Sequence, residues 1–171
     1  MNTLLDVIIF AINAHEGQIR KYTKKPYVTH PITVSNIVAS VTDDSDMIHA
    51  ALLHDTIEDT DVTFEEIEEK FGKEIARIVD GLTDVSKPED GNRAKRKELD
   101  KIHLSKGCEK IQTIKLADVI SNLSDIERFD SQFANIYFNE KKLLLNVLNK
   151  CNKTLYNKAK EIIENYTIKN L

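Results

Sequence analysis

The sequence predicts an all-α protein, and three observations support this fold class. Apolar positions recur at helical spacing, as in the i, i+4, i+7 series Leu4, Ile8 and Ala11. No stretch shows the alternation of a β-strand, and the five glycines and three prolines lie near expected helix boundaries. The chain has 171 residues, 41% of them apolar and 30% charged, which suits a folded core and argues against disorder. We therefore expect one domain over 1–171, a bundle of roughly eight to ten helices.

The first half of the chain predicts five helices. The first has a helical apolar face that reaches His15, and a basic loop follows it to His30. Pro31 suits the first turn of the second helix, and Asp44 can cap the third. Thr63 and Glu66 have the spacing of a capping box, which opens the fourth helix, and a fifth helix follows Gly72. The expected ranges are 4–15, 31–41, 47–57, 63–72 and 73–84.

The second half predicts four more helices. The turn-rich segment 86–91 is the clearest break in the chain, and a basic segment, 93–97, follows it. Helical periodicity then continues in the ranges 93–104, 109–127, 133–149 and 152–165.

Composition and charge exclude several classes of protein. There are 24 basic and 28 acidic residues, a net charge of −4, whereas nucleic acids and anionic membranes favour basic partners. The only two cysteines, Cys108 and Cys151, are far apart, which argues against a zinc ribbon or a disulfide framework. No apolar run is long enough to span a membrane, and the N-terminus lacks the features of a signal peptide. We expect a cytoplasmic protein that binds neither nucleic acid nor membrane; the sequence does not predict its oligomeric state.

The expected third helix carries the most unusual group of polar residues. Most of its positions are apolar, yet it contains His54 and Asp55, with Glu58 and Asp59 one helical turn further on. An unpaired carboxylate is costly to bury, and a metal ion would resolve the conflict. His54 and Asp55 would then be ligands, leaving the two later acids free for proton transfer. The alternative is that this helix ends at Leu53 and that the acids are simply solvated.

Two other segments offer groups that would complete such a site. His30 precedes Pro31 at the start of a helix, a position where an isolated histidine is more typical of a cap or a surface residue. On the expected helix 109–127, Lys115, Asp118 and Asn122 lie on one polar stripe opposite an apolar one. Taken alone, that stripe is typical of a helix face that contacts water.

Taken together, these residues resemble the HD-domain phosphohydrolases. The pattern is His30, the pair His54-Asp55, and the distant Asp118. The chain is most similar to the hydrolase domain of Rel/SpoT-type enzymes and to the stand-alone small alarmone hydrolases. The segments that carry the resemblance are AHEGQIRK (14–21), PYVTHP (26–31), AALLHDTIEDT (50–60) and KLADVISNL (115–123). They define a motif-bearing core of about 14–125, with the helices of 133–165 after it.

The resemblance implies a role for each matching residue. His30, His54, Asp55 and Asp118 would hold one divalent metal, Mn²⁺ in this family. Glu58 and Asp59 match the acidic pair assigned to catalysis. The residues that match substrate contacts are Arg20, Lys21 and Asn122, with Lys115 as a weaker match.

The implied reaction is hydrolysis of the 3′-pyrophosphate of guanosine tetra- or pentaphosphate, which gives GDP or GTP and pyrophosphate. An alternative is an HD phosphohydrolase for another nucleotide, such as a nucleoside monophosphate or an adenine alarmone. A catalytically silent nucleotide-binding domain is disfavoured because every candidate ligand and both acids are present.

The chain departs from the family pattern at Ser124, where the family usually has Arg or a similar group, and in Tyr22–Lys25, where it usually has a glycine.

Overall fold

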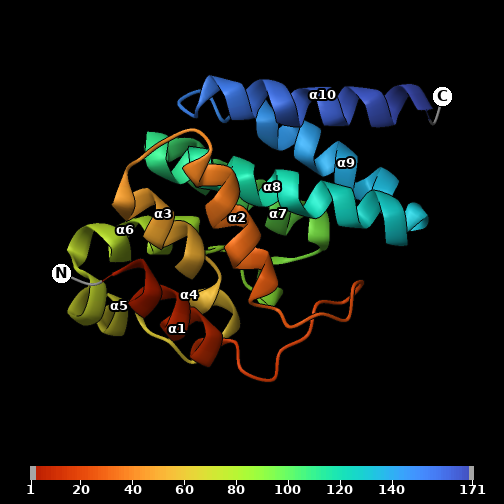
Figure 1. Cartoon of the computed structure of the whole chain (residues 1–171). Helices are drawn as coiled ribbons and strands as arrows, with labels where there is room; N and C mark the ends of the chain where they lie inside the picture. Colours follow the sequence, from red (N-terminus) through yellow and green to blue (C-terminus); the bar gives the residue numbers. More distant parts are fainter. Residues whose placement is uncertain (1–2, 170–171) are drawn as a thin grey trace. The chain divides into compact units, whose positions relative to one another are not determined.

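A computed structural model describes residues 3–169, and the regular elements of this part of the chain are all helices, which confirms the predicted fold class. Its only β-type feature is an isolated antiparallel bridge between Ile19 and Pro26. None of the described helices is both long enough and apolar enough to cross a membrane. Figure 1 shows the elements in order: α1 Leu4–Ala14, α2 Thr29–Ala39, α3 Ser45–Leu53, α4 Thr56–Asp59, α5 Phe64–Phe71, α6 Lys73–Leu82, the 3₁₀ turn η1 Pro88–Asp90, α7 Arg93–Lys106, α8 Glu109–Phe129, α9 Ser131–Leu145 and α10 Lys153–Lys169.

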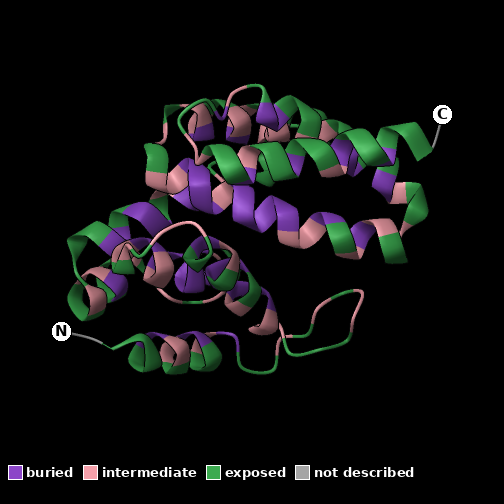
Figure 2. Ribbon diagram, turned by 45° about the horizontal axis from the view of Figure 1, so that its top comes forward, coloured by how far each residue is buried: buried purple, intermediate pink, exposed green. Residues whose placement is uncertain are grey.

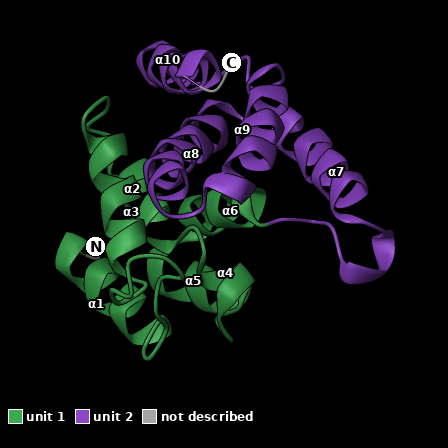
Figure 3. Ribbon diagram, turned by 90° about the vertical axis from the view of Figure 1, so that its right-hand side faces the viewer, with its two compact units in different colours: residues 1–83 green, residues 84–171 purple. Residues whose placement is uncertain are grey.

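The chain divides into two compact units, residues 1–83 and 84–171, which Figure 3 shows in different colours. The expectation of one domain over 1–171 stays a prediction.

In the first unit, α3 packs against α1, α2 and α6. Val34, Leu53 and Val79, from α2, α3 and α6, are completely buried in this core. The helix starts follow the predicted signals. The Asp44 carboxylate accepts hydrogen bonds from the first backbone amides of α3, and Thr63 and Glu66 form the capping box of α5. The core therefore holds α2 and α3 side by side, and the predicted ligands His30 and His54 lie in α2 and directly after α3.

In the second unit, α8 packs against α9 and α10, and 10 of its 21 residues are buried. Figure 2 colours the chain by burial. Gln112 is completely buried, and its side chain makes hydrogen bonds to the end of α7 and to the segment between α9 and α10. Its amide nitrogen donates to the carbonyl oxygens of Leu104 and Ser105, both 3.2 Å away, and its amide oxygen accepts from the Lys150 backbone at 2.8 Å. A buried amide is stable only with such partners, so Gln112 fixes both segments at the start of α8.

Every predicted helix is present, and one boundary is wrong in a way that matters. The range 47–57 was expected as a single helix, but α3 ends at Leu53 and a separate short helix, α4, begins at Thr56. The Thr56 hydroxyl donates to the carbonyl oxygen of Leu53 at 2.7 Å, a local hydrogen bond that competes with the continuing helix. His54 and Asp55 therefore lie at a break between two helices.

Candidate metal centre

The break after α3 presents His54 and Asp55 to one side of the first unit. The His54 side chain is buried, and its Nδ1 donates to the carbonyl oxygen of Ala51 at 2.8 Å. In the neutral imidazole the lone pair then lies on Nε2. This Nε2 is 3.1 Å from Asp55 Oδ1, which also carries lone pairs. Two acceptors at this distance repel each other, so the arrangement favours a proton or a metal cation between them.

His30 supplies the second imidazole. It lies in the first turn of α2, buried to 3% exposure, with its Nε2 3.7 Å from Asp55 Oδ2. Its ring centroid is 5.2 Å from that of His54. Ligand atoms of His30, His54 and Asp55 all lie within 4.8 Å of one another. His30 is therefore no surface histidine but part of a convergent cluster.

This donor set fits a divalent metal. Metal–ligand bonds of about 2 Å hold neighbouring ligand atoms roughly 3–4 Å apart, close to the spacing within the cluster. Imidazole nitrogen with carboxylate oxygen suits borderline first-row cations such as zinc, iron or manganese. The hydrogen bond from His54 Nδ1 to a carbonyl oxygen is the outer contact that orients a metal-binding histidine. Three of the four predicted ligands thus come together in the first unit.

The fourth predicted ligand, Asp118, lies on α8 in the second unit, and its role as a ligand stays a prediction. It is buried, so the expectation that its stripe simply contacts water is wrong at this position. Asn122 Nδ2 donates to Asp118 Oδ1 at 2.6 Å, and Lys115 Nζ lies 3.1 Å from Asp118 Oδ2. The three residues predicted from the KLAD segment therefore form one polar cluster, in which the Asp118 carboxylate is oriented from both sides.

The two acids predicted to transfer protons lie on α4. Glu58 and Asp59 are exposed residues, but the Asp59 carboxylate reaches back to Tyr27, whose hydroxyl is 3.0 Å from Asp59 Oδ2. Partial burial and then the charge of Asp55 raise the pKa of Asp59 above its usual value. A raised pKa makes a carboxylate a better proton acceptor, which suits a general base.

The predicted substrate-binding cations Arg20 and Lys21 lie in the loop between α1 and α2. Arg20 is half-buried, and its backbone amide donates to the carbonyl oxygen of Lys25 at 2.9 Å. The Lys21 ammonium is 3.1 Å from the Tyr22 hydroxyl. In the segment where the family usually has a glycine, Lys24 adopts a left-handed backbone with φ of +57°. The loop keeps the turn that glycine would favour, even though the residue is a lysine.

The sequence did not single out Tyr27 or His15 as site residues. The Tyr27 hydroxyl is 2.6 Å from Asp55 Oδ2, so this tyrosine contacts both the candidate ligand and Asp59. His15 is buried, and its Nδ1 is 2.8 Å from Gln18 Oε1. Tyr27 stands three residues before His30 in PYVTHP, and that position was the available signal.

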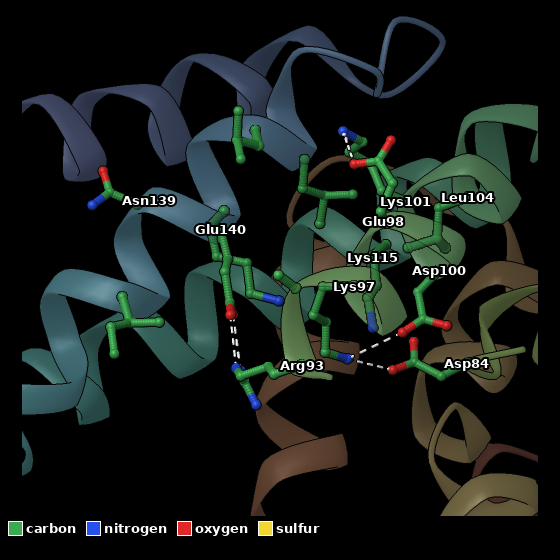
Figure 4. A pocket seen from close by; sticks show the side chains of 15 residues that line it. Asp84, Arg93, Lys97, Glu98, Asp100, Lys101, Leu104, Lys115, Asn139 and Glu140 are labelled. Atoms are coloured by element: carbon green, nitrogen blue, oxygen red, sulfur yellow. Dashed lines mark hydrogen bonds and ion pairs between the residues drawn. The ribbon is translucent and has the colours of Figure 1, made fainter. Parts of the chain in front are cut away.

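The second unit also contains a cavity of about 520 Å³ (Figure 4). Most of the charges that line it are paired within the unit. Arg93 makes two hydrogen bonds to Glu140, at 2.7 and 2.8 Å, and Lys97 lies 2.6 Å from Asp84 and 3.3 Å from Asp100. Lining residues that are apolar include Leu104, Ile136, Leu143 and Leu144.

The fold and the donor cluster together define a helical protein with a candidate divalent-metal centre. An HD-domain family model matches residues 8–139, a range that includes all four candidate ligands. The chain therefore belongs to the HD-domain family, and this confirms the resemblance seen in the sequence.

Named relatives place the chain more narrowly within this family. It is 42% identical over 129 residues to guanosine-3′,5′-bis(diphosphate) 3′-pyrophosphohydrolase MESH1 of Danio rerio, covering 73% of this chain and 69% of the relative. Mouse MESH1 is 39% identical over a match of the same length, covering 73% of this chain and 70% of the relative. The bifunctional (p)ppGpp synthase/hydrolase SpoT of Escherichia coli K12 is 43% identical over 84 residues, 49% of this chain and 12% of that enzyme.

Two solved structures are similar to this chain. One, described as a metazoan ortholog of SpoT that hydrolyses ppGpp, has a TM-score of 0.86 at 31% identity and covers 97% of both chains. A Listeria monocytogenes protein with a TM-score of 0.69 is 22% identical, covers 84% of this chain and 97% of that one, and shares the fold. The chain is thus homologous to MESH1 and to part of SpoT.

Proposed function

We propose that this protein is a metal-dependent guanosine-3′,5′-bis(diphosphate) 3′-pyrophosphohydrolase. It would cleave the 3′-pyrophosphate of guanosine tetra- or pentaphosphate and release GDP or GTP with pyrophosphate. The observation that carries this proposal is the 42% identity to a pyrophosphohydrolase of that name, together with the His30, His54 and Asp55 cluster. The metal we propose is Mn²⁺.

Different residues would bind the metal and accept the proton. His30, His54 and Asp55, with Asp118, would hold the cation. When bound, the cation supplies positive charge that makes water more acidic and offsets the charge of the phosphate oxygens. Asp59 would accept the proton of the attacking water, since its raised pKa suits that task, and Glu58 is the second candidate for the same role.

Other residues would bind the nucleotide. Arg20 and Lys21 would contact its phosphates, because guanidinium and ammonium groups make charge-assisted hydrogen bonds to phosphate oxygens. Asn122 would contact the nucleotide, and Lys115 would balance the charge of Asp118 or of a phosphate group. We also propose a cytoplasmic location. Cys108 and Cys151 are both free, which suits a reducing compartment.

The test is a product analysis. Purified protein loaded with Mn²⁺ is incubated with guanosine tetraphosphate, stopped with excess EDTA, and the products are separated by anion-exchange chromatography. We expect GDP and pyrophosphate in equal amounts, with no product in a sample treated with EDTA from the start. An inert alarmone with the metal shown to be bound, or release of orthophosphate by the enzyme itself, would overturn the proposal and favour another nucleotide as the substrate.

A further inference from the structure

Tyr27 is fixed at the base of the loop between α1 and α2. Its backbone amide donates to the carbonyl oxygen of Gln18 at 2.9 Å, and the bridge between Ile19 and Pro26 holds the two sides of the loop together. The next helix starts at once, and the His30 backbone amide donates to the Tyr27 carbonyl oxygen at 2.8 Å. The Tyr27 side chain is therefore placed by the same backbone that places His30.

The hydroxyl of Tyr27 stands between two carboxylates. It is 2.6 Å from Asp55 Oδ2 and 3.0 Å from Asp59 Oδ2. The other oxygen of Asp55, Oδ1, faces His54 Nε2 at 3.1 Å. The hydroxyl thus contacts Asp55 Oδ2, the oxygen that His30 Nε2 approaches to 3.7 Å, while Oδ1 is turned toward His54. It also links the candidate ligand to the candidate base.

The ring of Tyr27 contacts the rings of two histidines. Its centroid lies 5.9 Å from the His30 ring, edge-on, and 4.9 Å from the His15 ring. His15 is itself anchored, because Gln18 Oε1 is 2.8 Å from its Nδ1 while the Gln18 amide nitrogen donates to the backbone carbonyl of Asp59 at 2.7 Å. Both histidine rings therefore contact the tyrosine ring, and this packing restricts the movement of its hydroxyl away from the two acids.

We propose that Tyr27 is a positioning residue, which holds the ligand Asp55 and the proton acceptor Asp59 in fixed relation to each other. The proposal rests on the proposed function for the role of Asp59 and on the donor cluster alone for the role of Asp55. Loss of an outer hydrogen bond to a metal ligand typically weakens metal binding by about 10- to 100-fold. Tyr27 therefore has two separable effects, one on metal affinity through Asp55 and one on turnover through Asp59.

Metal affinity tests the first effect without any substrate. The variant Tyr27→Phe keeps the ring and removes only the hydroxyl. Titration of the metal-free protein with Mn²⁺, followed by the electron paramagnetic resonance signal of the free ion, should show affinity about 10-fold weaker than that of the wild type. The control is Tyr166→Phe, which loses a hydroxyl bonded to Asn135 at 2.9 Å in the second unit and should bind Mn²⁺ like the wild type. Wild-type affinity in Tyr27→Phe, with thermal unfolding showing a folded protein, overturns the role at Asp55.

Turnover at saturating Mn²⁺ and guanosine tetraphosphate tests the second effect. We expect Tyr27→Phe to lower kcat by about 10-fold with KM within about twofold, since the hydroxyl contacts the acids of the site. In an Asp59→Asn background the same substitution should change kcat little, because the group that it positions no longer accepts a proton. An equal loss of kcat in both backgrounds overturns the link to Asp59. If the wild type does not hydrolyse this nucleotide, the proposed function fails, and the Mn²⁺ titration still decides the role at Asp55.

Discussion

Carboxylates have opposite kinds of partner in the two units. In the second unit, Lys97 lies between Asp84 and Asp100. Burial alone would raise the pKa of Asp84, but the charges of Lys115 and Lys97 hold it below its usual value. In the first unit, the Asp55 and Asp59 carboxylates share one tyrosine hydroxyl, and the pKa of Asp59 is raised.

This difference distinguishes charged residues that pair within the fold from charged residues that are arranged to bind a ligand. The Asp84 and Asp100 carboxylates already have a lysine partner within the fold, and removing that partner would leave a buried charge uncompensated. In the first unit, two imidazoles and a carboxylate turn their acceptor atoms toward one point. A cation bound at this point would stabilise all three groups. Substitutions in the donor cluster of the first unit should therefore change metal binding and catalysis, whereas substitutions of the paired charges Arg93, Lys97 and Glu140 in the second unit should change stability.

The largest effect should come from the cluster itself. His54→Ala or Asp55→Ala removes one of the three convergent donors, so metal content and hydrolysis should be lost together. Elemental analysis of the purified variants, beside the product assay, measures both. His49→Ala is the matched control, because His49 lies on α3 outside the cluster and should keep metal and activity. Full metal occupancy in either cluster variant would show that the assigned site is wrong.

The next effect should separate proton transfer from metal binding. Asp59→Ala should keep the metal and lower kcat by about 10²-fold or more, the usual scale for loss of a general base. Glu58→Ala, in the same short helix, is the comparison variant and should lower kcat by less. If the Asp59 variant turns over normally while the Glu58 variant does not, the proton acceptor is Glu58, and the contact with Tyr27 is structural.

A smaller effect is expected in the loop. Arg20→Ala should raise KM for the alarmone several-fold and change kcat less, because a residue that binds ground state and transition state equally affects KM alone. Lys153→Ala removes another cation, at the start of α10, and serves as the control. Steady-state kinetics at saturating Mn²⁺ distinguishes the two parameters. A loss confined to kcat would mean that Arg20 contacts the phosphate mainly in the transition state.

The sequence predicted the helices well because apolar spacing is a local property. It predicted the wrong end for α3, since Ile57 continues the apolar pattern past His54 and only the hydrogen bond of the Thr56 hydroxyl to Leu53 shows the break. Residue type predicted His54 and Asp55 as ligands, and the resemblance to the HD-domain family added His30, but the geometry of the cluster depends on contacts between distant segments. Tyr27 was missed for the same reason, as its partners Asp55 and Asp59 lie 28 and 32 residues away.

The smallest predicted effect concerns Lys141, which lines the cavity of the second unit with its ammonium 4.7 Å from the centroid of the Tyr137 ring. Burial, and then the charge of Lys115, lower the pKa of Lys141 to about 8. In the unfolded chain a lysine titrates near 10.4, so between these values the unfolded state binds more protons and stability should rise with pH.

Replacing this lysine with an apolar residue removes the cost of burying its charge. Lys141→Met should be more stable than the wild type at pH 7, by on the order of 1 kcal/mol, and should gain less stability than the wild type between pH 7 and pH 9.5. Urea unfolding of both proteins at the two pH values gives their free energies of unfolding. The titration of other groups affects both proteins alike, so it cancels when these free energies are subtracted. Parallel pH dependence in the two proteins would show that the Lys141 ammonium is well solvated. The comparison would then need a different account of how the second unit accommodates its charges.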